Sequence, residues 1–269
     1  MEEAIKCIRG AIYEKLIRYF VELCVGEFKD CIDSIILYGS LARGEFIPNI
    51  SDIDILVIFN DKCWKGEVKD ETYPIPSWIV SILMTLLNEV HERFNLERHI
   101  IDLTVTTMNI MKNKMDPKFN VFWLNNVKKG YYVLYGADVL KDYVPPPITK
   151  ADVKRALQEL LRTAKLVAEA RRIGERELTL HDKAKACITN ALMAIQVFLC
   201  LYEDFIPSKA RACKEFQRKF PQSLEASIVC ELYEALLELD KLTQEHLKSL
   251  IIKSLTLIKL FLERSEIMS

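Results

Sequence analysis

The sequence lacks the features of a membrane-embedded or exported protein. No apolar run among its 269 residues reaches the roughly 18 residues that a membrane span needs. The longest candidate, residues 191–201, is shorter and contains Gln196. The start, MEEAIKCIRG, is charged and amphipathic, so we expect no signal peptide. These absences predict a cytoplasmic protein without a membrane partner.

An excess of one charge is also missing. The chain has 37 Lys and Arg against 38 Asp and Glu, giving a formal net charge of -1. Proteins that bind long stretches of nucleic acid usually carry a strong basic excess on one face. The balance therefore argues against nucleic acid as a partner.

The eight cysteines follow no recognisable pattern. They are scattered, most of them lie in apolar helical patterns, and no CxxC pair or zinc-like spacing occurs. We therefore expect reduced, buried thiols, as in most cytosolic proteins. Their even number leaves disulfides open.

Hydrophobic periodicity divides the chain into an α/β part and an all-helical part. In the first part, helices are predicted over residues 3–28, 77–94 and 119–129, and strands over 32–38, 51–59, 99–106 and 131–135. The segment YVPPPITK follows, and three consecutive prolines can neither continue a helix nor sit inside a sheet. Beyond it, helices are predicted over 150–173, 182–203, 208–220, 223–240 and 243–264. We predict an α/β domain over 1–143, a stiff linker over 144–149 and a helical bundle over 150–269.

The stretch LYGSLARGEFIPNISDIDILVIF, residues 37–59, carries two carboxylates in an otherwise apolar strand. Alternate residues of a strand share a face, so Asp52 and Asp54 project together while Ile53 and Ile55 face a core. Two neighbouring carboxylates repel each other unless a cation lies between them. Mg²⁺ prefers such oxygen ligands together with substrate phosphates, so the pair predicts a metal site.

Gly39 and Ser40 precede this pair and predict a phosphate-binding turn. Glycine allows a sharp turn and close approach of the backbone to a ligand. Amide groups at such a turn can bind an anion, and the Ser40 hydroxyl adds a donor. Arg43 is available for charge support, and Ser51 completes the candidate nucleotide-binding residues.

Asp102 is the best candidate for a third metal ligand. It interrupts the apolar segment IIDLTV, and a carboxylate in a buried strand is costly without a partner. If this strand lies beside residues 51–59, Asp102 can face Asp52 and Asp54.

The order of these elements resembles the signature of the DNA polymerase β-like nucleotidyltransferase superfamily. The signature comprises a hydrophobic strand, Gly39-Ser40, eleven residues, Asp52-x-Asp54 and a later acidic residue, here Asp102. The resemblance covers about the first 105 residues and implies an α/β fold, with a small mixed sheet and flanking helices. The helical part extends the likeness to kanamycin- or streptomycin-type nucleotidyltransferases and to minimal nucleotidyltransferases joined to HEPN-like helical domains. Residues 206–221, IPSKARACKEFQRKFP, carry this second likeness.

The resemblance implies an enzyme that transfers a nucleoside monophosphate, AMP by family likeness, from a nucleoside triphosphate to a hydroxyl group. Asp52, Asp54 and Asp102 would be catalytic and would bind Mg²⁺, or Mn²⁺ in its place. The acceptor, a small molecule or a protein, stays open, as does a homodimer. The aminoglycoside enzymes use a further glutamate as general base, for which Glu89, Glu92 and Glu97 are candidates by position.

Two other functions are compatible with the sequence. One is an antitoxin-like or regulatory protein that binds a partner through its helical bundle, with secondary or lost catalysis. The other is an RNA-end nucleotidyltransferase, which the near-neutral charge disfavours. The pair Arg176 and His181 fits the loose Arg-x(4–6)-His pattern of HEPN ribonucleases, but such a match is expected by chance.

Overall fold

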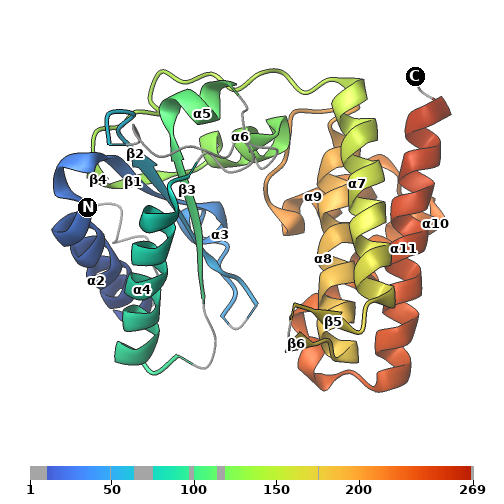
Figure 1. Ribbon diagram of the computed structural model, residues 1–269. Coiled ribbons are helices and arrows are strands. Elements are labelled where there is room, and N and C mark those ends of the chain that lie inside the picture. The colour runs from blue at the N-terminus through green and yellow to red at the C-terminus, as the bar shows by residue number, and fades with distance from the viewer. Residues whose placement is uncertain are drawn as a thin grey trace. The chain divides into compact units, whose positions relative to one another are not determined.

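The computed structural model of the chain describes residues 11–48, 50–63, 75–96, 100–113, 119–174 and 176–267 (Figure 1). The chain divides into two compact units, Met1–Pro145 and Pro146–Ser269, called here the α/β unit and the helical unit. The division falls within the run of three prolines. None of the described helices is long and apolar enough to cross a membrane.

The α/β unit contains a four-stranded mixed sheet. Its strands are β1 (Ile32–Tyr38), β2 (Ile53–Phe59), β3 (Ile101–Thr107) and β4 (Tyr132–Gly136), in the order β3-β2-β1-β4. β2 pairs parallel with β3, whereas β1 pairs antiparallel with both β2 and β4. The predicted α/β fold class with a small mixed sheet, followed by helices, is confirmed.

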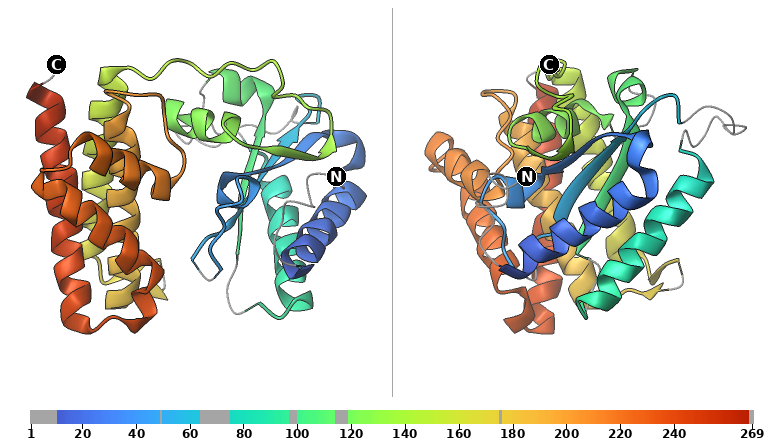
Figure 2. Two further views of the ribbon diagram at one scale, coloured as in Figure 1. Left: turned by 180° about the vertical axis from the view of Figure 1, so that it is seen from behind. Right: turned by 90° about the vertical axis from the view of Figure 1, so that its left-hand side faces the viewer.

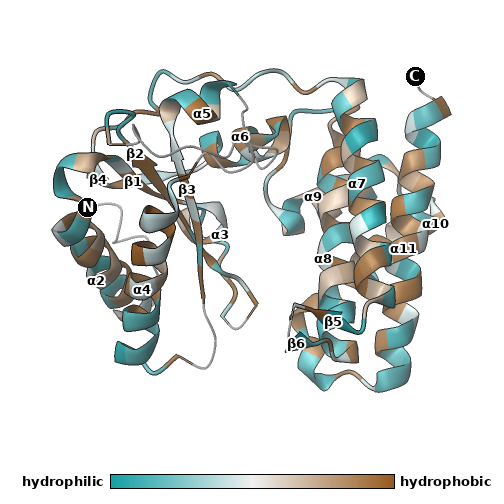
Figure 3. Ribbon diagram, viewed as in Figure 1, coloured by the Kyte–Doolittle hydropathy of each residue, from teal (hydrophilic) through white to brown (hydrophobic). Residues whose placement is uncertain are grey.

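Helices α2 (Ala11–Phe28) and α4 (Ser77–Arg93) cover one face of this sheet (Figures 1 and 2). Phe28 at the end of α2 packs edge-on against Phe59 of β2, with ring centroids 5.1 Å apart. Trp78 of α4 lies 6.2 Å from the same Phe28 ring. β2 is an inner strand, and its residues from Ile55 to Phe59 are all fully buried, which explains its continuous apolar sequence (Figure 3).

The opposite face of the sheet packs against α6 (Val121–Lys128). Asn120 caps this helix, because its side chain accepts hydrogen bonds from the amides of Phe122 and Trp123. The Trp123 ring lies edge-on to Tyr38 of β1, with centroids 5.7 Å apart. Two short helices directly follow strands of the sheet: α3 (Gly39–Ala42) follows β1, and α5 (Met108–Asn113) follows β3.

The helical unit consists of α7 (Lys150–Glu169), α8 (Leu180–Leu199), α9 (Lys209–Lys219), α10 (Leu224–Leu237) and α11 (Gln244–Ile267). α8 is the central helix and packs against the other four. Thr149 and Thr179 begin α7 and α8 with capping boxes, in which Asp152 and Asp182 return the hydrogen bond. Aromatic rings fill the core, where Phe198 stacks on Phe261 with centroids 4.5 Å apart.

Gln196 is a polar residue inside the buried part of α8, and its contacts explain it. The side-chain amide donates hydrogen bonds to the carbonyls of Ile206 and Pro207, at 2.9 and 2.6 Å. These bonds satisfy two backbone acceptors in the connection that leads to α9. Gln196 therefore fixes the path of the chain between α8 and α9.

The prediction that residues 150–173 form one helix was wrong at its end. α7 stops at Glu169, and a two-stranded hairpin follows, with β5 (Arg172–Ile173) and β6 (Arg176–Glu177). Gly174 has a φ of 59° at the hairpin turn, a conformation that favours glycine over other residues. A single glycine is too weak a sequence signal to predict a hairpin whose strands have only two residues each.

The buried carboxylate of Glu225 supplies a stability test for the helical unit. Its Oε1 lies 2.6 Å from Arg264 Nη2, and the exposed fractions of the two side chains are 6% and 39%. Arg264→Met removes the partner and leaves the carboxylate buried. Because Arg264 is 39% exposed, solvent screens part of its interaction with Glu225. We therefore expect the free energy of unfolding, measured by urea denaturation, to fall by about 2 kcal/mol.

The exposed pair between Lys253 and Glu231 provides the matched control, since its side chains are 36% and 46% exposed. Lys253→Met should cost well under about 1 kcal/mol. Equal losses in the two variants would show that burial of Glu225 does not make its partner important.

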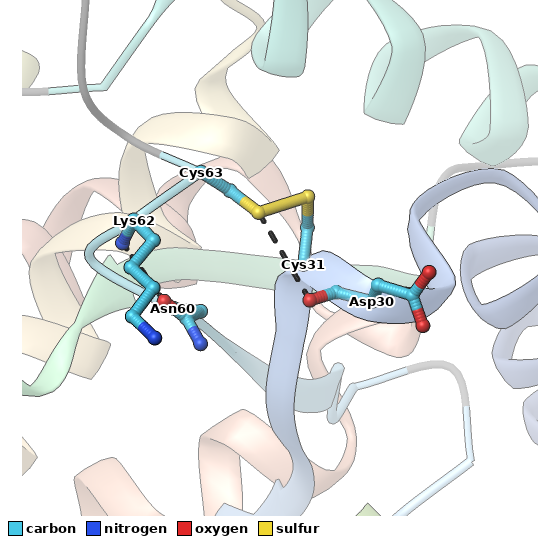
Figure 4. The surroundings of a disulfide bond; sticks show 5 residues. All are labelled: Asp30, Cys31, Asn60, Lys62 and Cys63. Atoms are coloured by element: carbon cyan, nitrogen blue, oxygen red, sulfur yellow. Dashed lines mark hydrogen bonds between the residues drawn. A yellow bond between two sulfur atoms is a disulfide. The ribbon is translucent and has the colours of Figure 1, made fainter.

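The expectation of reduced cysteines was wrong for one pair. Cys31 and Cys63 form a disulfide, with Cα atoms 5.5 Å apart (Figure 4). Cys31 directly precedes β1 and Cys63 follows β2, so antiparallel pairing of these strands brings the two together. The amide of Asn60 donates to the carbonyl of Cys31 at 2.8 Å, which extends the pairing toward the disulfide.

The other described cysteines form no disulfide, and three of the five are buried as expected. Cys24, Cys187 and Cys213 are buried, whereas Cys200 and Cys230 are partly exposed. Burial raises the pKa of the Cys24 thiol to about 12, so this thiol stays protonated at neutral pH. Cys7 lies outside the described residues.

The disulfide closes a loop that contains β1, α3 and β2, and we expect it to stabilise the α/β unit. With a sequence separation of 32, loop-closure entropy predicts a loss of about 3.7 kcal/mol in unfolding free energy for Cys63→Ser. The measurement is guanidinium denaturation of the oxidised wild type and the variant.

A reducing agent is the control for this prediction. It should lower the stability of the wild type toward that of Cys63→Ser and leave the variant unchanged. A wild type whose denaturation midpoint is the same with and without reductant would refute the stabilising role.

Candidate nucleotide site

The Gly39-Ser40 turn lies directly against Asp54. Tyr38 and Asp54 are paired residues of the antiparallel strands β1 and β2, and Gly39 is the first residue beyond this pair. A Cβ atom at Gly39 would lie 1.9 Å from Asp54 Oδ2 and 2.6 Å from Asp54 Cγ. The φ of Gly39 is 76°. Both the backbone conformation and the carboxylate therefore require glycine here.

Asp54 and Asp102 are neighbours across the parallel strands β2 and β3, where they are direct register partners. Paired residues project to the same face of a sheet, so the two carboxylates share the face that Tyr38 also occupies. Asp52 lies two residues before Asp54, immediately ahead of β2. The sheet thus places Asp54 and Asp102 side by side on one face, with Asp52 just ahead of the same end of β2.

Exposure differs among these carboxylates. Asp52 and Asp102 are exposed, and Asp54 is partly buried. The expectation that Asp102 sits in a buried strand was wrong, because β3 is an edge strand. Its exposure leaves the carboxylate accessible to a ligand.

Burial and the negative charges of Asp54 and Asp102 all affect the pKa of the Tyr38 hydroxyl. Burial, with added repulsion from the negative charges of Asp54 and Asp102, raises the pKa of Tyr38 well above its usual range. The hydroxyl is therefore protonated at any physiological pH. It lies 3.2 Å from Thr104 Oγ1 and accepts a hydrogen bond from Trp123 Nε1 at 3.4 Å.

Sequence reasoning did not select Tyr38, Thr104 or Trp123. Two of them had an available signal: Tyr38 directly precedes Gly39, and Thr104 follows Asp102 by two residues and so shares its face. Trp123 reaches the site through the packing of α6, for which the sequence holds no local signal.

Two predicted nucleotide-binding residues have protein partners. Arg43 donates from Nη1 to Asn126 Oδ1 at 3.0 Å and from Nε to Glu45 Oε2 at 3.2 Å. The Ser51 hydroxyl accepts a hydrogen bond from the amide of Ile47 at 3.0 Å. Both side chains thereby shape the loop that joins Gly39 to Asp52, and their nucleotide-binding role stays a prediction.

Ser40, the other predicted donor, is partly exposed in α3. Its carbonyl accepts a hydrogen bond from the amide of Glu45 at 2.8 Å. This bond closes the turn that carries Ser40, and its direct binding of phosphate stays a prediction as well.

The candidate general bases are not next to Asp54. Glu89 and Glu92 belong to α4, which covers the opposite face of the sheet (Figure 2). Glu89 accepts a hydrogen bond from the Tyr19 hydroxyl of α2. Glu97 lies outside the described residues, so the identity of an additional base stays open.

The HEPN-like pair also has ordinary partners. Arg176 forms an ion pair with Asp182 at 2.8 Å, and His181 Nε2 lies 2.8 Å from Asp240 Oδ1. Both side chains are exposed, and both contacts lie within the helical unit. These contacts agree with a structural role for both residues.

The chemistry of the site fits a divalent cation that prefers oxygen. Asp54 and Asp102 offer carboxylate oxygens from adjacent strands, with Asp52 two residues away. Among the described residues, no three acidic, histidine or cysteine side chains already converge on a single metal position. Mg²⁺ commonly takes one or two carboxylates and completes its shell with phosphates and water, so two neighbouring aspartates suffice for the fit.

Residues 17–123 match the family model described as a nucleotidyltransferase domain. This segment therefore supports a nucleotidyltransferase domain within the α/β unit. The domain makes the protein a transferase, and nucleotidyltransferases generally use a nucleoside triphosphate and a divalent metal. The matched range contains Gly39, Ser40, Asp52, Asp54 and Asp102.

The chain also resembles a solved structure in its fold. This is the crystal structure of spectinomycin adenyltransferase AAD(9) from Enterococcus faecialis with ATP and spectinomycin. The TM-score is 0.58 at 14% sequence identity, and the match covers 91% of this chain and 98% of that one. At this identity the likeness shows the fold alone. No curated protein sequence matches the chain.

Proposed function

We propose that this nucleotidyltransferase transfers AMP from ATP to a hydroxyl group of a small molecule or protein and releases pyrophosphate. The observation that carries the proposal is the contact between Gly39 and Asp54, which places a glycine turn directly on a carboxylate. Asp102 lies beside Asp54 on the same face, and both aspartates belong to the segment that matches the nucleotidyltransferase model. The fold likeness to an adenyltransferase crystallised with ATP supports AMP as the transferred group.

In the proposed reaction, the acceptor oxygen forms a bond to the α-phosphorus while the bond from that phosphorus to the β-phosphate bridge breaks. The turn at Gly39 and Ser40 binds the β- and γ-phosphates, which leave as pyrophosphate. Asp102, an exposed carboxylate on the edge strand, accepts the proton of the attacking hydroxyl. Mg²⁺ or Mn²⁺, held by Asp52, Asp54 and Asp102, would supply neutralisation of the phosphate charge.

The experiment is incubation with ATP labelled at the α-phosphate, Mg²⁺ and a panel of hydroxyl acceptors. Spectinomycin is the first acceptor to test, because the structurally similar AAD(9) was crystallised with it. We expect label to appear in an acceptor together with an equal amount of pyrophosphate. Parallel reactions with the other nucleoside triphosphates test the preference for adenine. Absence of acceptor-dependent pyrophosphate with every triphosphate would refute the proposal.

A further inference from the structure

Two side chains on α6 reach the two ends of the short helix α3. Trp123 and Asn126 are three residues apart and so share one face of α6. Trp123 Nε1 donates to the hydroxyl of Tyr38, and Asn126 Oδ1 accepts from Arg43 Nη1. Tyr38 is the N-cap of α3 and Arg43 is its C-cap. α6 therefore contacts the cap residues at both ends of the helix that contains Gly39 and Ser40.

Both contacts lie in well-packed surroundings. Tyr38 is only 2% exposed, and the Trp123 ring that covers it is itself packed edge-on by Phe119, with centroids 5.0 Å apart. The Arg43 side chain is 14% exposed. A Cβ atom built at Gly130, two residues after the end of α6, would lie 2.8 Å from Arg43 Cγ. Partial exclusion of water makes each hydrogen bond more costly to lose.

The donor and acceptor roles link α6 to the strand that carries Asp102. An indole N–H can only donate, so the Tyr38 oxygen accepts from Trp123 and keeps its own proton for another partner. Thr104 Oγ1 of β3 lies 3.2 Å from that oxygen. The hydrogen bonds therefore connect α6, the residue before Gly39, and β3.

α3 needs such external support. It has only four residues, and its internal bonds include a contact of 3.3 Å from the Arg43 amide to the Gly39 carbonyl. One isolated helical turn is unstable in water, because few hydrogen bonds offset the ordering of its backbone. Gly39 has no side chain that would hold its own conformation.

We propose that Trp123 and Asn126 are positioning residues that hold the Gly39-Ser40 turn in the conformation that binds the triphosphate. The inference rests on the proposed function for its link to the nucleotide, but the holding of the turn can be measured without any ligand. It assigns Arg43 to the support of the turn, through Asn126, and it gives α6 a role in the site.

The test uses the full-length chain with Trp123→Phe, which keeps an aromatic ring but removes the N–H donor, and with Asn126→Ala. Hydrogen exchange is measured at the amides of Arg43 and Glu45, which donate to the carbonyls of Gly39 and Ser40. We expect exchange at these two amides to become about tenfold faster in each variant, as for the loss of one net hydrogen bond. The Kd for Mg-ATP should rise by a similar factor of about ten, while the Kd for adenosine stays unchanged.

Lys128→Met is the matched control on the same helix. Lys128 Nζ donates to the carbonyls of Leu140 and Lys141, at 2.7 and 2.8 Å, and contacts neither end of α3. This variant should leave exchange at Arg43 and Glu45 unchanged. Unchanged exchange in both Trp123→Phe and Asn126→Ala, or an equal increase in Lys128→Met, would overturn the positioning role. Failure of the wild type to bind any triphosphate would instead overturn the proposed function, because the exchange result does not depend on nucleotide.

Discussion

Asp54→Asn is expected to reduce nucleotidyl transfer by at least about 1,000-fold while the protein stays folded. Asparagine has nearly the same volume, so the contact with Gly39 is kept while one negative charge is lost. That charge lies beside Asp102 in the register of β2 and β3, at the proposed metal position. Its removal also relieves repulsion between the two carboxylates, so the melting temperature of the metal-free protein should be equal or higher.

Asp33→Asn is the control for this prediction. Asp33 is a partly buried aspartate of β1, and its strand pairs with β2 as well. It lies at the end of β1 remote from Tyr38 and Gly39, so this variant should keep wild-type transfer. Turnover of Asp54→Asn within about tenfold of the wild type would contradict the assignment of Asp54, since loss of a metal-binding charge costs several kcal/mol.

Gly39→Ala is the second change with a large expected effect. The added Cβ would collide with Asp54 Oδ2 at 1.9 Å, and the φ of 76° is strained for alanine. Asp54 must then move away from the turn. We expect triphosphate affinity to fall by at least about 100-fold, equivalent to about 2.7 kcal/mol, with adenosine binding little changed. Calorimetric titration with ATP and with adenosine measures the two affinities.

Gly44→Ala separates backbone strain from the collision. Gly44 has a φ of 71°, yet nothing lies within 4 Å of a Cβ built there. Alanine at this position should cost only the strain, about 1 kcal/mol of unfolding free energy, and leave ATP affinity near that of the wild type. Equal losses of affinity in Gly39→Ala and Gly44→Ala would mean that strain alone, and not displacement of Asp54, accounts for the effect.

A double-mutant cycle isolates the contact itself. Asp54→Ala removes the carboxylate, which contributes the two nearest atoms to a Cβ at Gly39, and leaves the Asp54 Cβ at 3.0 Å. Gly39→Ala should therefore destabilise the protein less in the Asp54→Ala background than in the wild type, by about 1 to 2 kcal/mol. Strict additivity of the two changes would contradict the close packing of Gly39 and Asp54.

The local pattern of the sequence predicts much of the α/β unit. β1 and β2 are found at their places because their apolar runs end at marked positions, the Gly39-Ser40 turn and the Asp52-Asp54 pair. The alternation of strand side chains also predicts that Asp102 joins Asp54, provided that β3 lies beside β2. The parallel register confirms this placement.

Features that depend on how elements pack could not be predicted from such patterns. The Cys31–Cys63 disulfide follows from the register of β1 and β2, whereas 32 positions of sequence separate the two residues. Asp102 is exposed because the strand order leaves β3 at an edge, which no periodicity of its own sequence reveals. The contacts of Trp123 and Asn126 depend on the docking of α6, at a distance of 83 residues or more from Tyr38 and Arg43.

A crystal structure of the protein with Mg²⁺ and a non-hydrolysable ATP analogue tests the central claim most directly. The account predicts that the β- and γ-phosphates lie against the backbone of Gly39 and Ser40, with the metal between the phosphates and the carboxylate of Asp54. A triphosphate bound elsewhere in the chain, with no contact to Gly39 and no metal at Asp54, would contradict it.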